Sequence, residues 1–117
     1  MRDAVIQMAE IFKAFGDPTR LRIIKMLASN PERKLCVGAI ANTLGITQPA
    51  VSQHLKVLKN VRLIDPNRDG FQIHYAINPE TLADFRKYLD ALSELAFVKC
   101  PYEDGCQKQG EEISGAP

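Results

Sequence analysis

Two short stretches with helical spacing, joined through one glycine, constrain this chain more than any other feature. Residues 37–44 and residues 48–59 each carry apolar side chains three and four positions apart. Gly45 is placed to end the first stretch in a left-handed conformation, and Thr47 is placed to cap the second. The pattern predicts a helix-turn-helix, a unit whose second helix can enter the major groove of DNA.

The spacing of apolar residues then changes from the period of a helix to that of a strand. Residues 71–77 alternate between apolar and polar or small side chains, which predicts a half-buried strand. A shorter strand is predicted at residues 61–64, and the tip between the strands is predicted at residues 67–70, with Gly70 free to take a positive φ. We therefore expect a β-hairpin directly after the helix-turn-helix.

Three further stretches show helical spacing. They cover residues 4–15, 18–28 and 79–96, and Asp17 followed by Pro18 is a typical start for the second of them. The predicted inward face of that second helix consists of Leu21, Ile24, Leu27 and Ala28. The predicted order is α-α-α-α-β-β-α, so the fold class is mostly α with a small β-hairpin wing (α+β), a winged helix-turn-helix.

The length of 117 residues fits a single domain. We assign residues 1–99 to a winged helix-turn-helix domain for DNA binding and dimerisation, and residues 100–117 to a flexible tail that contains cysteines. No apolar run approaches the ~18 residues of a membrane span, and the N-terminus lacks the features of a signal peptide. We therefore expect a cytoplasmic protein with no membrane partner, and three cysteines fit a reducing compartment.

Basic charge is concentrated in the middle of the chain. Residues 13–68 contain ten Lys or Arg against three Asp or Glu, a net charge of +7, whereas residues 69–117 carry −5 and residues 1–12 carry −1. This distribution favours a surface that binds a polyanion, and chance segregation of solvent-exposed charges is the alternative.

The helix predicted at residues 48–59 presents side chains suited to reading DNA. Opposite its apolar sector lie a proline, a hydroxyl, an amide and an amine, instead of the acidic–basic pairs of a merely solvated helix. Amides can bond to adenine through two hydrogen bonds, and basic side chains contact phosphate. His54 lies closer to the apolar sector, and we expect packing or backbone support from it, with a base contact as the alternative. The predicted DNA-binding residues are Thr47, Gln48, Pro49, Ser52, Gln53, Lys56, Lys59 and, near the hairpin tip, Arg68.

The last predicted helix carries more apolar surface than a small domain can cover. Its apolar residues recur at alternating spacings of three and four, and a second row formed by Tyr88, Ala91 and Leu95 lies beside the first. We expect one row to pack inside the chain and the other against a second copy, and burial of both rows within one chain is the alternative. The residues predicted at a homodimer interface of the first and last helices are Val5, Met8, Phe12, Leu82, Phe85, Leu89 and Leu92.

The segment LASNPERKLCVGAIANTLGITQPAVSQHLKVLKNVRLIDPNRDGFQIHYAI resembles the winged helix of the ArsR/SmtB transcriptional repressors, and FKAFGDPTRLRIIKML resembles their second-helix signature. The resemblance covers about residues 5–98. It implies a homodimer built on the first and last helices, and a repressor that leaves imperfectly palindromic operator DNA when an effector binds. It also implies recognition-helix positions for Gln48, Pro49, Ser52, Gln53 and Lys56, and a wing position for Arg68.

The effector stays open, because the metal motifs that this resemblance implies are broken. Where the arsenic, lead and cadmium sensors have two cysteines flanking a valine, this chain reads Cys36-Val37-Gly38, and the zinc motif of the last helix is absent in either alignment frame. Cys36, Cys100 and Cys106 offer three thiols for As(III) or another thiophilic ion. Two thiols suffice for a disulfide or polysulfide bridge that senses oxidants or sulfide. A chain without cysteine-based sensing is the third alternative.

Two other classes of function fit the sequence less well. A thiol oxidoreductase using Cys100 and Cys106 lacks a C-x-x-C motif and the strand–helix alternation of thioredoxin-like folds. A winged helix used only for protein contact does not explain the basic middle of the chain. No nucleophile–base–acid set or phosphate loop occurs in the sequence, so we do not expect an enzyme.

Overall fold

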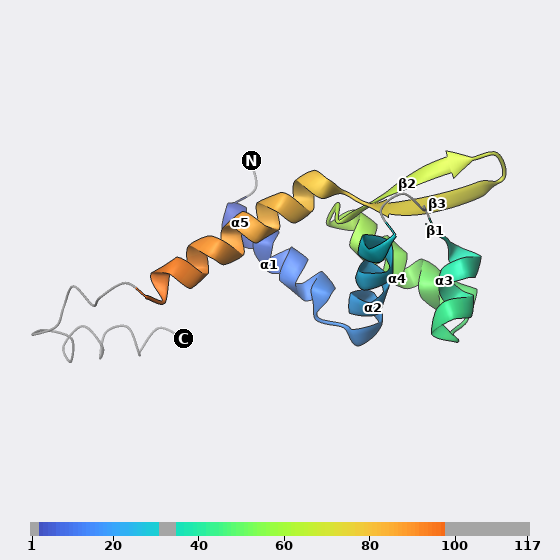
Figure 1. The fold of residues 1–117 in the computed structure, drawn as a ribbon, viewed down its shortest axis with the longest axis horizontal. Helices are drawn as coiled ribbons and strands as arrows, with labels where there is room; N and C mark the ends of the chain where they lie inside the picture. The colour runs from blue at the N-terminus through green and yellow to red at the C-terminus, as the bar shows by residue number, and fades with distance from the viewer. Residues whose placement is uncertain (1–2, 31–34, 98–117) are drawn as a thin grey trace, which may run out of the picture.

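The computed structural model describes residues 3–30 and 35–97. Five helices and a three-stranded antiparallel sheet occur within these ranges (Figure 1). The helices are α1 (Ala4–Phe15), α2 (Pro18–Ser29), α3 (Val37–Leu44), α4 (Gln48–Asn60) and α5 (Pro79–Leu95), and the strands are β1 (Leu35–Cys36), β2 (Ile64–Asp69) and β3 (Gln72–Ile77). The winged helix-turn-helix predicted from the sequence is confirmed, and its predicted order holds except for the additional short strand β1.

Side-chain caps begin four of the five helices. Each cap accepts a hydrogen bond from a backbone N–H of the first turn, at 2.8 to 3.3 Å, which satisfies donors that the helix itself leaves without a partner. The capping residues are Asp3, Asp17, Thr47 and Asn78.

The buried core joins all five helices to the base of the hairpin. Its buried members are Ile11, Ala14, Ile23, Ile24, Leu27, Ile40, Ala41, Val51, Leu55, Leu58, Leu63, Ile64 and Phe85. The predicted inward face of α2 is wrong in part, because Leu21 is 49% exposed and Ala28 is exposed, whereas Ile23 is fully buried. The buried stripe of α2 is centred on residues 23, 24 and 27, and at 100° per residue both misassigned side chains lie about a quarter turn or more from that centre.

The sheet has the order β1-β3-β2, with β3 in the middle. Leu35 of β1 pairs with Tyr75, and Cys36 pairs with His74. β1 was missed because two residues are too short to show an alternating pattern. β2 is an edge strand, which explains how it tolerates Pro66, a residue without a backbone N–H.

The hairpin tip is tighter than predicted. β2 and β3 pair without interruption from Ile64↔Ile77 to Asp69↔Gln72, so only Gly70 and Phe71 remain in the loop. Gly70 has φ +64°, as the first central residue of a type II′ turn requires. The predicted four-residue tip at 67–70 is therefore wrong, and Phe71 belongs to the tip instead of the strand.

The segment predicted as the start of the hairpin instead closes α4. The N–H of Arg62 donates to the carbonyl of Lys59 at 2.9 Å. The N–H of Leu63 donates to the carbonyl of Leu58 at 3.0 Å, which completes the bond pair of a Schellman motif. Arg62 takes the left-handed position of this motif, with φ +61°, and it is the one non-glycine residue with positive φ within the described ranges. The predicted strand is therefore wrong before Ile64.

A membrane-crossing helix does not occur within residues 3–30 and 35–97, because none of the helices there combines sufficient length with sufficient apolar character.

Candidate nucleic-acid interface

α3 and α4 form the helix-turn-helix, and the turn between them is closed by backbone geometry. Gly45 has φ +68°, and the N–H of Ile46 donates to the carbonyl of Ala41 at 3.2 Å. Oγ1 of Thr47 accepts a hydrogen bond from the N–H of Ala50 at 3.3 Å, which begins α4. These contacts set the direction in which α4 leaves α3.

α4 has one buried face and one polar, exposed face. Val51, Leu55 and Leu58 are at most 1% exposed and anchor the helix to the core. All the residues predicted to bind DNA are exposed: Thr47, Gln48, Pro49, Ser52, Gln53, Lys56 and Lys59 on or beside α4, and Arg68 on β2. The helix therefore presents hydroxyl, amide and ammonium groups to an external partner, and what they bind stays a prediction at this point.

A groove of about 480 Å³ separates the start of α4 from the wing. Gln48 and Ser52 line it from α4, and Ile73 and Tyr75 line it from β3. The groove thus brings residues of the predicted reading helix and of the wing to one surface, although they lie more than 20 positions apart in the sequence.

The strand register separates the charges of the wing onto two faces. Residues two apart on a strand share a face, and directly paired residues share it too. Arg68 therefore shares a face with its partner Ile73 and with Tyr75, both of which line the groove. Asp65 and Asp69 lie on the opposite face. Arg68 thus shares the face of two groove-lining residues, and Gln72, the partner of Asp69 on the opposite face, lines the groove as well.

Arg20 ties α1, α2 and α4 together. Its Nε donates to the carbonyl of Ala14 at 2.6 Å, and one of its terminal nitrogens lies 3.4 Å from the carbonyl of Lys13. Its other terminal nitrogen lies 3.3 Å from Nδ1 of His54 on α4. Arginine can only donate, whereas the role of Nδ1 in this contact depends on the tautomer of the His54 ring. The supporting role expected for His54 matches this contact, whereas the sequence indicated only a basic charge at Arg20.

Asp17 strengthens the same junction. Its Oδ1 accepts from the N–H groups of Thr19 at 2.8 Å and of Arg20 at 3.1 Å, and it lies 4.0 Å from Nδ1 of His54. The backbone N–H of Arg20 is the main reason that the pKa of the Asp17 carboxyl lies below its ordinary value. The N–H of Thr19, the charge of Arg20 and the charge of His54 when its ring is protonated lower the pKa of Asp17 too, against the opposing effect of desolvation.

α1 and α5 cross and contact each other (Figure 1). Together they expose apolar side chains. Phe85 does not belong to this surface, because it is 9% exposed and its ring centroid lies 4.9 Å from that of Phe12 and 5.0 Å from that of Phe15. We therefore correct its assignment from the dimer interface to the core. Among the other predicted interface residues, Met8 and Leu82 are half-buried, and Val5, Phe12, Leu89 and Leu92 are exposed. The second row of α5 is also accessible, with Leu95 exposed and Tyr88 half-buried.

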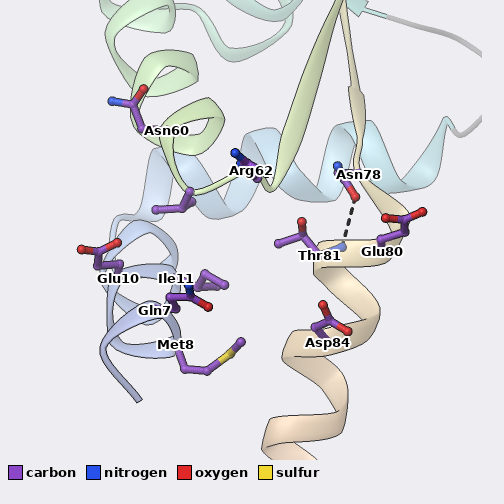
Figure 2. Close-up of a pocket in the computed structure, with 11 residues that line it drawn as sticks. Gln7, Met8, Glu10, Ile11, Asn60, Arg62, Asn78, Glu80, Thr81 and Asp84 are labelled. Carbon is purple, nitrogen blue, oxygen red and sulfur yellow. Dashed lines mark hydrogen bonds between the residues drawn. The ribbon is translucent and has the colours of Figure 1, made fainter. Parts of the chain in front are cut away.

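A polar cavity of about 600 Å³ lies between α1, the end of α4 and the start of α5 (Figure 2). Arg62 lies at its upper edge in the view of Figure 2, and Glu80 and Asp84 line it from α5. Nothing in the sequence indicated this cavity, since its lining comes from three separate segments.

The predicted cysteine site falls only partly within the described ranges. Cys36 is a free, half-buried thiol at the N-cap of α3, and it lines the groove between α4 and the wing. Cys100 and Cys106 lie outside the described residues. Within residues 3–30 and 35–97, no three or more His, Cys, Asp and Glu side chains gather closely enough to hold a metal ion. The three-thiol site stays a prediction.

A capped polar helix after a glycine turn, flanked by a two-stranded wing and supported by three further helices, defines a winged helix-turn-helix protein of the DNA-binding class. Comparisons with known proteins place it more narrowly. The family model described as "Bacterial regulatory protein, arsR family" matches residues 17–65.

Relatives with known names agree with this match. An HTH-type transcriptional regulator of Methanocaldococcus jannaschii is 42% identical over 84 residues, which is 72% of this chain and 92% of that protein. A transcriptional repressor SmtB homolog of Synechocystis sp. is 34% identical over 93 residues, which is 79% of this chain and 68% of that protein. A solved homodimeric winged helix-turn-helix DNA-binding domain of Mycobacterium bovis is 28% identical, with a TM-score of 0.62 and coverage of 77% of this chain and 81% of that one.

This chain therefore belongs to the ArsR family and is a transcriptional regulator. The family predicted from the sequence is confirmed.

Proposed function

We propose that the chain acts as a homodimeric, sequence-specific repressor, with α4 in the major groove of operator DNA and the wing on the neighbouring stretch of the duplex. One observation carries the proposal. Gln48 and Ser52 of α4 line the same groove as Ile73 and Tyr75, which share their face of the wing with Arg68, whereas Asp65 and Asp69 lie on the other face.

The chemistry of this surface suits DNA in two ways. Gln53 and Gln48 carry amides that can bond to adenine, and Ser52 can meet a base edge or a phosphate. Lys56 and Arg68 supply the positive charge that phosphate contacts require, and such contacts provide most of the affinity and its salt dependence.

The apolar surface on α1 and α5 supports a homodimer. Leu92 is 44% exposed on α5, and burying it against a second copy would remove apolar surface from water, which favours association. The related domain of Mycobacterium bovis is homodimeric. A two-fold axis through this surface would present two copies of α4 about one helical turn of DNA apart, and the matching operator is an imperfect palindrome.

Release of DNA by an effector is the last part of the proposal. Cys36 borders the groove that DNA would occupy, so an ion or a sulfur bridge at this thiol would lie next to Gln48 and Ser52. We keep the three alternatives: a thiophilic ion such as As(III), oxidation or polysulfide bridging, and no cysteine-based sensing. The site is tested by titrating the DNA complex with arsenite, zinc, peroxide and polysulfide, for the parent protein and for Cys36→Ser, Cys100→Ser and Cys106→Ser.

Sequence-specific reading is tested on a duplex selected by the protein from a random pool. Gln53→Ala and Ser52→Ala should each weaken binding to the selected duplex by about 1–3 kcal/mol and leave binding to random DNA nearly intact. Asn60→Ala is the matched control, because this exposed amide lies at the opposite end of α4. An equal loss on both kinds of DNA would refute direct reading by α4, and failure to select any duplex would refute the proposal as a whole.

A further inference from the structure

Phe71 stands alone at the tip of the wing. It is one of the two loop residues of the hairpin, and its side chain is 108% exposed, more than that of any other large apolar residue within the described ranges. The hairpin projects beyond the helices, at the end of the molecule opposite the far end of α5 (Figure 1). A ring in this position contributes nothing to the core of its own chain, and its exposure costs free energy unless another molecule covers it.

The surroundings of Phe71 identify what can cover it. It borders the same groove as Gln48 and Ser52 of α4. Two residues further along the chain lies Ile73, 37% exposed, and its strand partner Arg68 shares its face of the wing. An apolar ring beside a cation, with the carboxylates turned to the opposite face, is complementary to the inside of a nucleic-acid groove bordered by phosphates.

We propose that the ring of Phe71 inserts into the minor groove next to the major-groove segment read by α4. This inference rests on the proposed function. α4 occupies the major groove, and the groove that follows along the duplex within reach of a flanking hairpin is the minor groove. Phenylalanine is among the apolar side chains that enter minor grooves and partly unstack a base step, which bends the duplex around the protein.

The contribution of Phe71 differs in kind from that of Arg68. A ring that leaves water for the groove releases no counterions, so its removal lowers affinity equally at all salt concentrations. Loss of Arg68 removes a phosphate contact and flattens the dependence of log K on log salt by about one unit. The two residues lie on the same wing and therefore separate apolar from electrostatic binding within one structural element.

The affinity test uses the full-length dimer and its selected palindromic duplex. Phe71→Ala should weaken binding about tenfold per wing, with the salt slope and the thermal unfolding midpoint of the free protein unchanged, and Phe71→Leu should lose less. Phe97→Ala is the matched control, because Phe97 is 89% exposed and comes two residues after Leu95, where α5 ends far from the wing (Figure 1). Measurements are made at protein concentrations that keep all variants dimeric.

The position of the ring is tested by changing only the minor groove. Replacing single flanking adenines with 2,6-diaminopurine adds an amino group to the minor groove and leaves the major-groove edge intact. At one position on each flank, this change should weaken the parent protein several-fold and have no further effect on Phe71→Ala.

Equal affinities of Phe71→Ala and the parent protein would overturn the inference, and so would a diaminopurine effect of the same size in both. A parent protein that selects no duplex would instead refute the proposed function. Failure of the inference is thereby distinguished from failure of the function on which it rests.

Discussion

Replacing Arg62 with glycine should stabilise the protein, although it removes a charged side chain that follows α4. Arg62 takes the left-handed position at the end of α4 with φ +61°, which costs a residue with a Cβ about 1–2 kcal/mol. Both hydrogen bonds of this turn use backbone atoms, so they survive the substitution. Glycine also loses more conformational freedom on folding than arginine does, which costs about 0.5–1 kcal/mol and offsets part of this relief. We expect a net gain of about 0.5–1 kcal/mol.

Gly45 provides the mirror experiment within the same molecule. It ends α3 with φ +68°, and the bond from Ile46 to Ala41 spans five residues, as the bond from Leu63 to Leu58 does at the end of α4. A Cβ added at Gly45 would meet no atom within 4 Å, so Gly45→Ala should cost about 1 kcal/mol through backbone conformation alone.

The assay for both substitutions is urea unfolding at one fixed protein concentration, since a dimer's stability depends on concentration. Arg62→Ala is the control that removes the guanidinium but keeps a Cβ, and it should give no comparable gain. If Arg62→Gly and Arg62→Ala unfold at the same urea concentration, the left-handed strain assigned to Arg62 does not exist and the reasoning fails.

Three further predictions concern the support of α4 and the dimer surface. Arg20→Ala should lower the free energy of unfolding by about 1–2 kcal/mol, because it removes charge-assisted hydrogen bonds that water replaces only in part. Arg22→Ala, at an exposed position, is the control and should change it by no more than about 0.5 kcal/mol. Equal urea midpoints for the two variants would refute the linking role of Arg20. The pKa of Asp17 is lowered by folding, so its carboxylate stabilises the native state above its ordinary pKa of 3.8 and this contribution is lost as the pH falls through the lower, native value. The difference in unfolding midpoint between the parent and Asp17→Asn should therefore shrink toward low pH, and a difference that grows would contradict the assignment. Leu89→Glu should convert the dimer to a folded monomer by light scattering and circular dichroism, while Lys87→Glu on the same helix stays dimeric; an intact Leu89→Glu dimer would place the interface elsewhere.

Glycine explains which helix ends were predictable from the sequence. Gly45 announces the turn of the helix-turn-helix, because glycine adopts a positive φ without a Cβ penalty. At the end of α4 the same conformation is taken by Arg62, so no residue type announced it and Val61 was assigned to a strand. The tip of the hairpin was misplaced for a related reason: Gly70 was recognised, but pairing extends through Asp69 and Gln72 up to the loop, a fact of register that residue types do not reveal.

The exposed residues of the site followed from helical periodicity alone, whereas its support did not. Once Val51 and Leu55 are assigned to the core, the position of Gln53 on the outer face is fixed by geometry. The contact between Arg20 and His54 joins residues 34 positions apart and depends on how α2 crosses α4. Likewise, the sequence placed Arg68 near the tip of the wing, but only the strand register shows which face it occupies.

The prediction of the dimer interface was limited in the same way, because the sequence does not show which apolar residues of α5 its own chain covers. The heptad row of α5 was read correctly as apolar, but periodicity cannot say which part of a row its own chain covers. Phe85 is covered by the rings of Phe12 and Phe15 of α1, and Leu89, one turn further along, is 37% exposed. The boundary between core and open surface therefore falls within a single row, where the cover supplied by α1 ends.

The supports of α4 bear on how an effector could act. The turns before and after α4 contain left-handed residues, Gly45 and Arg62. Arg20 connects α4 to α1 through its contacts with His54 and the carbonyl of Ala14. α1 also contributes to the apolar surface that we assign to the dimer. Both ends of α4 and one of its flanks are therefore held in place. Bending α4 would break backbone and arginine contacts together, so a shift of two intact subunits against each other costs less free energy. An effector bound at the dimer surface would then alter the spacing between the two copies of α4, whereas one bound at Cys36 would act in the groove between α4 and the wing, beside Gln48 and Ser52.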